Sequence, residues 1–185
     1  MKSKLMEFFE ATPIIAAAHE HNWKEAVESP AKVVLCCAAN IMTIEEKVKE
    51  IHSQGKIAFV NVDLSEGIGR DKSGIEFLAK CKVDGVVSTR GNLVKFAKEL
   101  GLVTVQRFFA LDAKGISGIK DLSAVTRPDF IEIMPGVIEK IIRQFANGPT
   151  PVLVGGLIDT KEEIVAALNN GALAISTSKK ELWYL

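Results

Sequence analysis

The chain has 185 residues, of which 23 are Lys or Arg and 23 are Asp or Glu, so its formal net charge is zero. Hydrophobic residues make up 48% of the chain and charged residues 25%. This composition excludes a largely disordered protein, because there is enough apolar surface to bury in a core. The balanced charge also disfavours a protein that binds nucleic acid through overall positive charge.

Targeting signals are missing from the sequence. No apolar run reaches the roughly 18 residues that span a membrane, and the acidic N-terminal stretch lacks the apolar centre of a signal peptide. We therefore expect a cytoplasmic protein that does not contact membranes. Cys36 and Cys37 are predicted to point to opposite faces of one strand, and Cys81 stands alone. No metal-ligand spacing occurs, so we expect buried, reduced thiols and no metal site.

Eight short apolar runs recur along the chain. Most are continuously apolar rather than alternating, which is typical of parallel strands covered on both faces. The runs are 14–18, 33–38, 57–62, 85–88, 102–109, 129–134, 151–155 and 172–176.

Helical patterns fill the gaps between these runs. The clearest helices are predicted after Thr43, over 91–100, over 136–146 and after Asp159, each closed by a glycine. Asp112 is expected to cap the helix that follows it. The tail, 179–185, is predicted to form one short turn. The N-terminal residues either plug the bottom of the fold or form a frayed arm; they are Leu5, Met6, Phe8 and Phe9.

Eight strand–helix units and no second zone of composition predict an α/β protein. We predict a single compact (β/α)8 TIM-type barrel with short loops over residues 1–185. The alternative is an open doubly wound sheet. That fold usually carries a glycine-rich nucleotide loop after its first strand, and the sequence has no such loop.

Small polar residues follow the last two predicted strands. Gly155 and Gly156 end the seventh strand, and Ser176 and Thr177 end the eighth. In barrels these two loops form a recurrent phosphate site, because free N–H groups there favour an anion. The alternative interpretation is a tight turn followed by a helix cap.

Three charged residues lie at or near the carboxyl ends of predicted strands: Asp63, Arg107 and Glu132. Ile131 and Ile133 should face the helices, which directs Glu132 into the barrel. A buried carboxylate must be paired or hydrogen-bonded, so Glu132 is a general base, an acceptor for a polyol hydroxyl, or the partner of Arg107. Asp63 poses the same choice between ligand contact and structural pairing.

Six motifs together resemble the glycerol-uptake-operon antiterminator family of glycerol-3-phosphate-responsive regulators. The likeness runs from about Pro13 to Trp183. The motifs are VDLSEGIGRDK (62–72), STR (88–90), QRFFALD (106–112), EIMPG (132–136), GGLI (155–158) and STS (176–178).

The resemblance implies a regulator that binds the effector glycerol 3-phosphate, uses no cofactor, and acts on the leader mRNA of glycerol operons to prevent premature termination. Backbone and hydroxyl groups of the two phosphate loops would then hold the phosphate, while Asp63, Arg107 and Glu132 would hold the glycerol. Arg70, Lys72 and Arg90 lie in loops predicted to meet the RNA; the alternative is that they are solvated charges.

An enzyme is the main alternative class. Barrels that hold phosphate are commonly isomerases or aldolases, and Glu132 would then be the base. Against this, the sequence shows no acid–base pair and no inward strand lysine, so we expect no catalytic residue. The apolar face of 136–146 either packs on the barrel wall or forms a homodimer contact.

Overall fold

The computed structural model describes residues 2–185 and shows a closed barrel of eight parallel strands. Each strand pairs with the next along the chain, and β8 pairs with β1 to close the ring. The predicted (β/α)8 barrel is therefore confirmed. The strands are β1 Ile14–Ala18, β2 Val33–Cys36, β3 Ile57–Asn61, β4 Gly85–Ser88, β5 Val103–Phe109, β6 Phe130–Met134, β7 Val152–Gly155 and β8 Ala174–Thr177.

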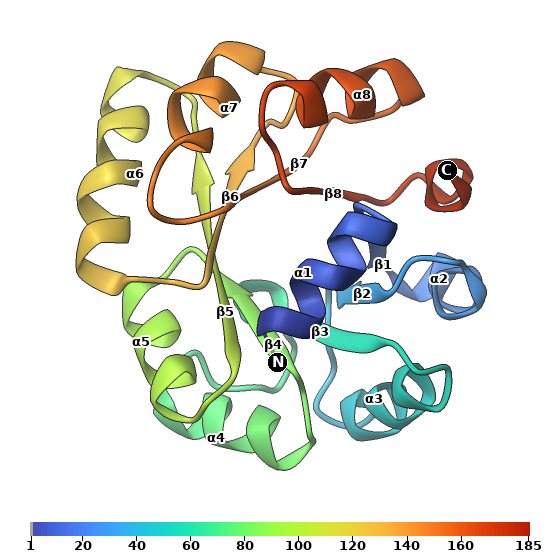
Figure 1. Cartoon of the computed structure of the whole chain (residues 1–185). Helices are drawn as coiled ribbons and strands as arrows, with labels where there is room; N and C mark the ends of the chain where they lie inside the picture. Colours follow the sequence, from blue (N-terminus) through green and yellow to red (C-terminus); the bar gives the residue numbers. More distant parts are fainter. Residues whose placement is uncertain (1) are drawn as a thin grey trace.

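Helices ring the strands, except α1, which lies across one end of the barrel (Figure 1). After β8 the ring is completed by a short 3-10 turn, η3, in place of a full helix, as predicted for the tail. The helices are α1 Lys2–Ala11, α2 Trp23–Glu28, α3 Ile44–Ser53, α4 Lys72–Lys80, α5 Gly91–Glu99, α6 Ala113–Thr126, α7 Glu139–Ala146 and α8 Lys161–Asn169. The 3-10 turns are η1 Glu20–Asn22, η2 Val62–Leu64 and η3 Lys180–Tyr184. Within residues 2–185, no helix is long and apolar enough to cross a membrane.

Strand alternation divides the apolar residues into two cores. One fills the barrel interior, and the other packs between the strands and the surrounding helices. Cys36 belongs to the outer core and Cys37 to the inner one, which confirms their predicted opposite orientations. Ile131 and Ile133 face the helices, also as predicted.

Helix α1 closes the amino end of the barrel. Leu5 and Phe9 are almost completely buried and belong to the interior core, with Met6 and Phe8 packed against it. The Phe9 ring meets Phe130 edge to face, with centroids 6.0 Å apart. The predicted plug is confirmed, and because it fills that end, a ligand has to enter from the carboxyl ends of the strands.

Side-chain caps start several helices on the carboxyl side of the barrel. Asp71 accepts a hydrogen bond from the Gly74 N–H, and Asp112 accepts one from the Gly115 N–H, as predicted for Asp112. The loop placement of Lys72 is wrong, because the Asp71 cap makes Lys72 the first residue of α4.

Helix α7 starts three residues later than predicted. The Gly136 N–H donates to the carbonyls of Gly155, at 2.7 Å, and Gly156, at 3.1 Å, so this glycine joins two loops and does not start the helix. The apolar face of α7 packs on the barrel wall through Ile141 and Ile142.

Candidate functional site

A cavity of about 220 Å³ opens at the carboxyl ends of the strands. Four of the predicted site residues line it: Arg107, Gly156, Ser176 and Thr177. The remaining lining residues are Ala17, His19, Leu35, Cys37, Asn61, Leu64, Met134, Leu157, Ile158, Asp159 and Ser178.

A buried ion pair joins Arg107, which lines this cavity, to Glu132. The Arg107 Nε–H donates to a Glu132 carboxylate oxygen at 2.7 Å, and both side chains are buried. Burial alone would lower the pKa of Arg107, but the charge and hydrogen bond of Glu132 outweigh it, so the pKa of Arg107 is raised. Glu132 therefore points inward as predicted and is the partner of Arg107. Among residues 2–185, no hydrogen bond occupies the terminal guanidinium nitrogens of Arg107, which lines the cavity.

Gly155 lies directly against this ion pair. A Cβ at this position would lie 2.9 Å from Glu132 Oε1 and 3.2 Å from the Ser176 carbonyl oxygen, so a side chain here would displace one of them. Close approach of backbone, carboxylate and the eighth strand thus requires glycine.

The loop after β7 contributes Gly156 and Leu157 to the cavity lining. Gly156 and Leu157 both have left-handed backbone conformations, with φ of 73° and 60°. Backbone N–H groups in a turn that lack a carbonyl acceptor can bind an anion. Outside the strand ladder, no hydrogen bond is made by the N–H groups of Gly156 and Leu157 among residues 2–185.

The loop after β8 supplies further donors. The Ser178 N–H and the Ser176 hydroxyl also have no hydrogen-bond partner among the described residues. The Thr177 hydroxyl is committed to the protein, because it donates to the Ile158 carbonyl at 3.1 Å and accepts from the Lys179 N–H. At the rim, Lys179 Nζ lies 3.4 Å from the Asp159 carboxylate and partly neutralises it.

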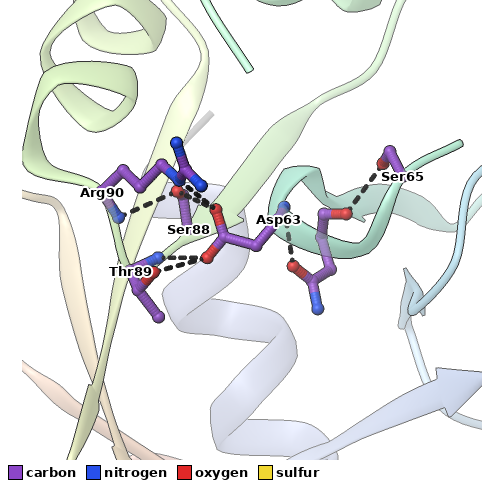
Figure 2. A network of polar contacts seen from close by, with 6 residues as sticks. Asp63, Ser65, Ser88, Thr89 and Arg90 are labelled. Atoms are coloured by element: carbon purple, nitrogen blue, oxygen red, sulfur yellow. Dashed lines mark hydrogen bonds and ion pairs between the residues drawn. The ribbon is translucent and has the colours of Figure 1, made fainter. Parts of the chain in front are cut away.

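Asp63 does not reach the cavity. Its carboxylate accepts hydrogen bonds from the Ser88 hydroxyl at 2.7 Å and from the Thr89 N–H and hydroxyl at 2.6 and 2.8 Å (Figure 2). Asn61, two residues earlier, occupies the cavity wall in its place. In the structure, Asp63 is therefore hydrogen-bonded to Ser88 and Thr89. Its predicted contact with glycerol stays a prediction.

Cys37, His19 and Asn61 are among the cavity residues that were not predicted as site residues. Cys37 follows β2, and burial raises the pKa of its thiol to about 11, which makes it a poor nucleophile at neutral pH. His19 follows β1 and stacks on His21, with ring centroids 5.6 Å apart. Asn61 ends β3. Their positions at strand ends were the signal available; none belongs to a chemical motif.

Arg70 and Arg90, two of the predicted RNA contacts, line a separate open groove beside the cavity. Lys72 is exposed and does not line it. In the part of the chain that the structure describes, no group of three or more His, Cys, Asp or Glu side chains is placed to hold a metal ion.

The family model and the similar solved structures point to the same protein family. The family described as "Glycerol-3-phosphate responsive antiterminator" matches residues 14–183. A glycerol uptake operon antiterminator regulatory protein from Listeria monocytogenes is 31% identical, with a TM-score of 0.88 over 93% of this chain and 95% of that one. An antiterminator-related protein from Thermotoga maritima is 30% identical, with a TM-score of 0.82 over 92% and 96%.

Among curated proteins, the uncharacterized protein YgcP of Escherichia coli is 32% identical over 98% of this chain and 96% of its own length. A deoxyribose phosphate aldolase from Aeropyrum pernix is only 14% identical, with a TM-score of 0.69 over 97% of this chain and 94% of that one. At that identity the likeness shows the barrel fold alone.

Proposed function

The chain belongs to the glycerol-3-phosphate responsive antiterminator family, and on that premise we propose that it binds glycerol 3-phosphate in the barrel cavity and then binds the leader mRNA of glycerol-utilisation operons. RNA binding in the presence of the effector prevents premature termination of transcription. The proposal places the protein in the cytoplasm, where the transcripts are made. The observation that carries the ligand half is a cavity with free N–H donors on one wall and a guanidinium in its lining.

The phosphate is assigned to the loops after β7 and β8. Gly156, Leu157 and Ser178 supply backbone N–H donors, and Ser176 adds a hydroxyl. Hydrogen bonds from N–H groups to a charged phosphate are about twice as strong as those between neutral groups. Since Lys179 offsets the charge of Asp159 at the rim, that carboxylate does not repel the ligand strongly.

The glycerol moiety is assigned to the Arg107–Glu132 ion pair. The terminal nitrogens of Arg107 donate to its hydroxyl oxygens, and the Glu132 carboxylate accepts from a hydroxyl proton. Asn61 on the wall offers both a donor and an acceptor. A site with both kinds of group recognises hydroxyls in a defined orientation, and an unphosphorylated or oxidised analogue leaves some of these groups unpaired.

Several contacts favour a sensor over an enzyme. An aldolase of the Schiff-base type needs a lysine in the cavity, and the described lining residues include none. Lys56 has its pKa lowered to about 8 by burial, but it lies at the start of β3 and donates to the carbonyls of Ser29 and Ala26. Glu132, the base of the alternative isomerase or aldolase, is engaged with Arg107.

Phosphorus NMR of glycerol 3-phosphate titrated with the protein tests the ligand half of the proposal. We expect a shifted or broadened ligand resonance with no new species over hours. A growing product resonance, lost in Glu132→Gln, would establish the enzyme instead. An unperturbed resonance would remove the cavity as the effector site.

A further inference from the structure

An open groove of about 490 Å³ lies between the loop after β3 and the loop after β4, apart from the effector cavity. Its lining residues are Ser65, Gly67, Ile68, Gly69, Arg70 and Arg90. The lining carries two cationic side chains and three residues with little or no side chain, so the groove is open to a bulky ligand.

Two carboxylates near this groove accept hydrogen bonds from the protein. Asp71 caps the Gly74 N–H, and Glu66 accepts from the Asn40 side chain at 3.1 Å. Arg90 Nε lies 3.9 Å from Asp63 Oδ1, too far for a direct hydrogen bond, and its side chain is half exposed. Within residues 2–185, Arg70 has no ion-pair partner. Both guanidinium groups thus keep free N–H donors, and a bidentate arginine contact is the geometry that phosphate favours.

Asp63 holds the segment that carries Arg90. Its carboxylate receives three hydrogen bonds from Ser88 and Thr89, and the Ser88 hydroxyl in turn accepts the Arg90 N–H at 3.0 Å (Figure 2). Hydrogen bonds to Asp63 in η2 therefore hold the backbone before α5, across the gap between the two loops. In this arrangement a half-buried carboxylate orients a surface arginine.

The turn that contains Asp63 also borders the effector cavity. Asn61 and Leu64 line the cavity, while Ser65 lines the groove. Three hydrogen bonds hold this turn together. The Asn61 side chain accepts from the Asp63 N–H, the Ser65 hydroxyl donates to the Asn61 carbonyl at 2.8 Å, and the Ser65 N–H donates to the Val62 carbonyl at 3.3 Å. Residues 61–65 thus form one compact unit in contact with both sites.

We propose that the Arg70–Arg90 groove binds a backbone phosphate of RNA, and that the 61–65 turn couples it to the effector cavity, with Asp63 as the positioning residue for Arg90. The inference rests on the proposed function, because RNA supplies the phosphodiester. Effector bound against Asn61 and Leu64 restrains the turn, and the turn then holds Arg90 where phosphate meets it. Effector and RNA therefore strengthen each other's binding by the same factor.

The test uses fluorescence anisotropy of a labelled leader transcript, from a glycerol-utilisation operon of the genome that encodes this chain, with saturating glycerol 3-phosphate. Arg70→Gln combined with Arg90→Gln removes both groove charges. Lys32→Gln combined with Lys80→Gln is the matched control, since both lysines are exposed and lie at the amino end of the barrel. Calorimetry of glycerol 3-phosphate binding checks the cavity in each variant.

We expect the groove variant to bind the transcript at least tenfold more weakly, with effector affinity within twofold of the wild type. Its salt slope should fall by about 0.7, the contribution of one phosphate contact on single-stranded RNA. The control should keep the wild-type slope. Wild-type RNA affinity in the groove variant would overturn this inference and leave the proposed function standing. A wild-type protein that fails to bind the transcript with effector would instead overturn the proposed function.

Asp63→Asn separates positioning from a general structural role. The amide keeps the shape of the side chain but presents N–H groups to the donors of Ser88 and Thr89. We expect weaker RNA binding in the wild-type background and less than a twofold further effect in the Arg90→Gln background. An equal effect in both backgrounds would show that Asp63 does not act through Arg90.

Discussion

Replacing Arg107 with Met removes the cation that compensates Glu132 while keeping much of the side-chain volume. Glu132 is 2% exposed, and its bond to Arg107 Nε measures 2.7 Å. With charge centres about 4 Å apart and an effective dielectric constant of about 20, the lost attraction is about 4 kcal/mol. This agrees with the 3–5 kcal/mol typical of breaking a buried ion pair from one side. We therefore expect Arg107→Met to lower the free energy of unfolding by about 3–5 kcal/mol.

Urea denaturation at pH 7 measures this loss, and a double variant tests its cause. Arg107→Met with Glu132→Gln removes the uncompensated charge, so it should be more stable than Arg107→Met alone. Arg143→Met is the control, because that guanidinium is exposed and bonds only the Asn170 side chain among described residues. It should cost less than about 1 kcal/mol. A double variant no more stable than the single one would refute the assignment of Arg107 as the partner on which Glu132 depends.

Gly155→Ala should lower the free energy of unfolding by about 1–3 kcal/mol and weaken glycerol 3-phosphate binding. Gly118→Ala, with open space around its Cβ, should do neither. Equal effects in both variants would show that close packing around Gly155 is not the cause. The rate of Cys37 alkylation by iodoacetamide should rise about tenfold per pH unit from pH 7 to 10, because the pKa of the thiol is about 11. Saturating glycerol 3-phosphate should slow the reaction. An alkylation rate unchanged by glycerol 3-phosphate would place the ligand elsewhere. The pKa of Lys56 is lowered to about 8 in the folded protein, so the unfolded chain binds more protons above pH 8. The free energy of unfolding should therefore rise from pH 8 to 9 relative to Lys56→Met; parallel curves would contradict the pKa shift.

Most strands were predictable because burial on both faces makes them continuously apolar. The strands at 14–18 and 85–88 match the predicted runs residue for residue. Where the prediction erred by one or two residues, apolar residues belong to a neighbouring turn. Ala172, for example, closes α8 by donating to the Ala167 carbonyl, so β8 begins at Ala174.

The inward direction of Glu132 was predictable from Ile131 and Ile133, because alternation along a strand decides which side chains point inward. Strand alternation gives the wrong direction for Asp63. Extending β3 by alternation beyond Asn61 turns Asp63 inward, but the strand ends at Asn61 and η2 rotates Asp63 toward the loop after β4. A strand end that shifts by one residue changes which side chain reaches the cavity.

Glycerol 3-phosphate should raise the affinity of the protein for leader RNA. The first experiment is to titrate the labelled leader transcript with wild-type protein, with and without saturating glycerol 3-phosphate. We expect glycerol 3-phosphate to tighten RNA binding by about 5- to 150-fold, the usual range of allosteric coupling, while free glycerol at the same concentration leaves it unchanged. The same dissociation constant with and without glycerol 3-phosphate would show that effector and RNA binding are not coupled.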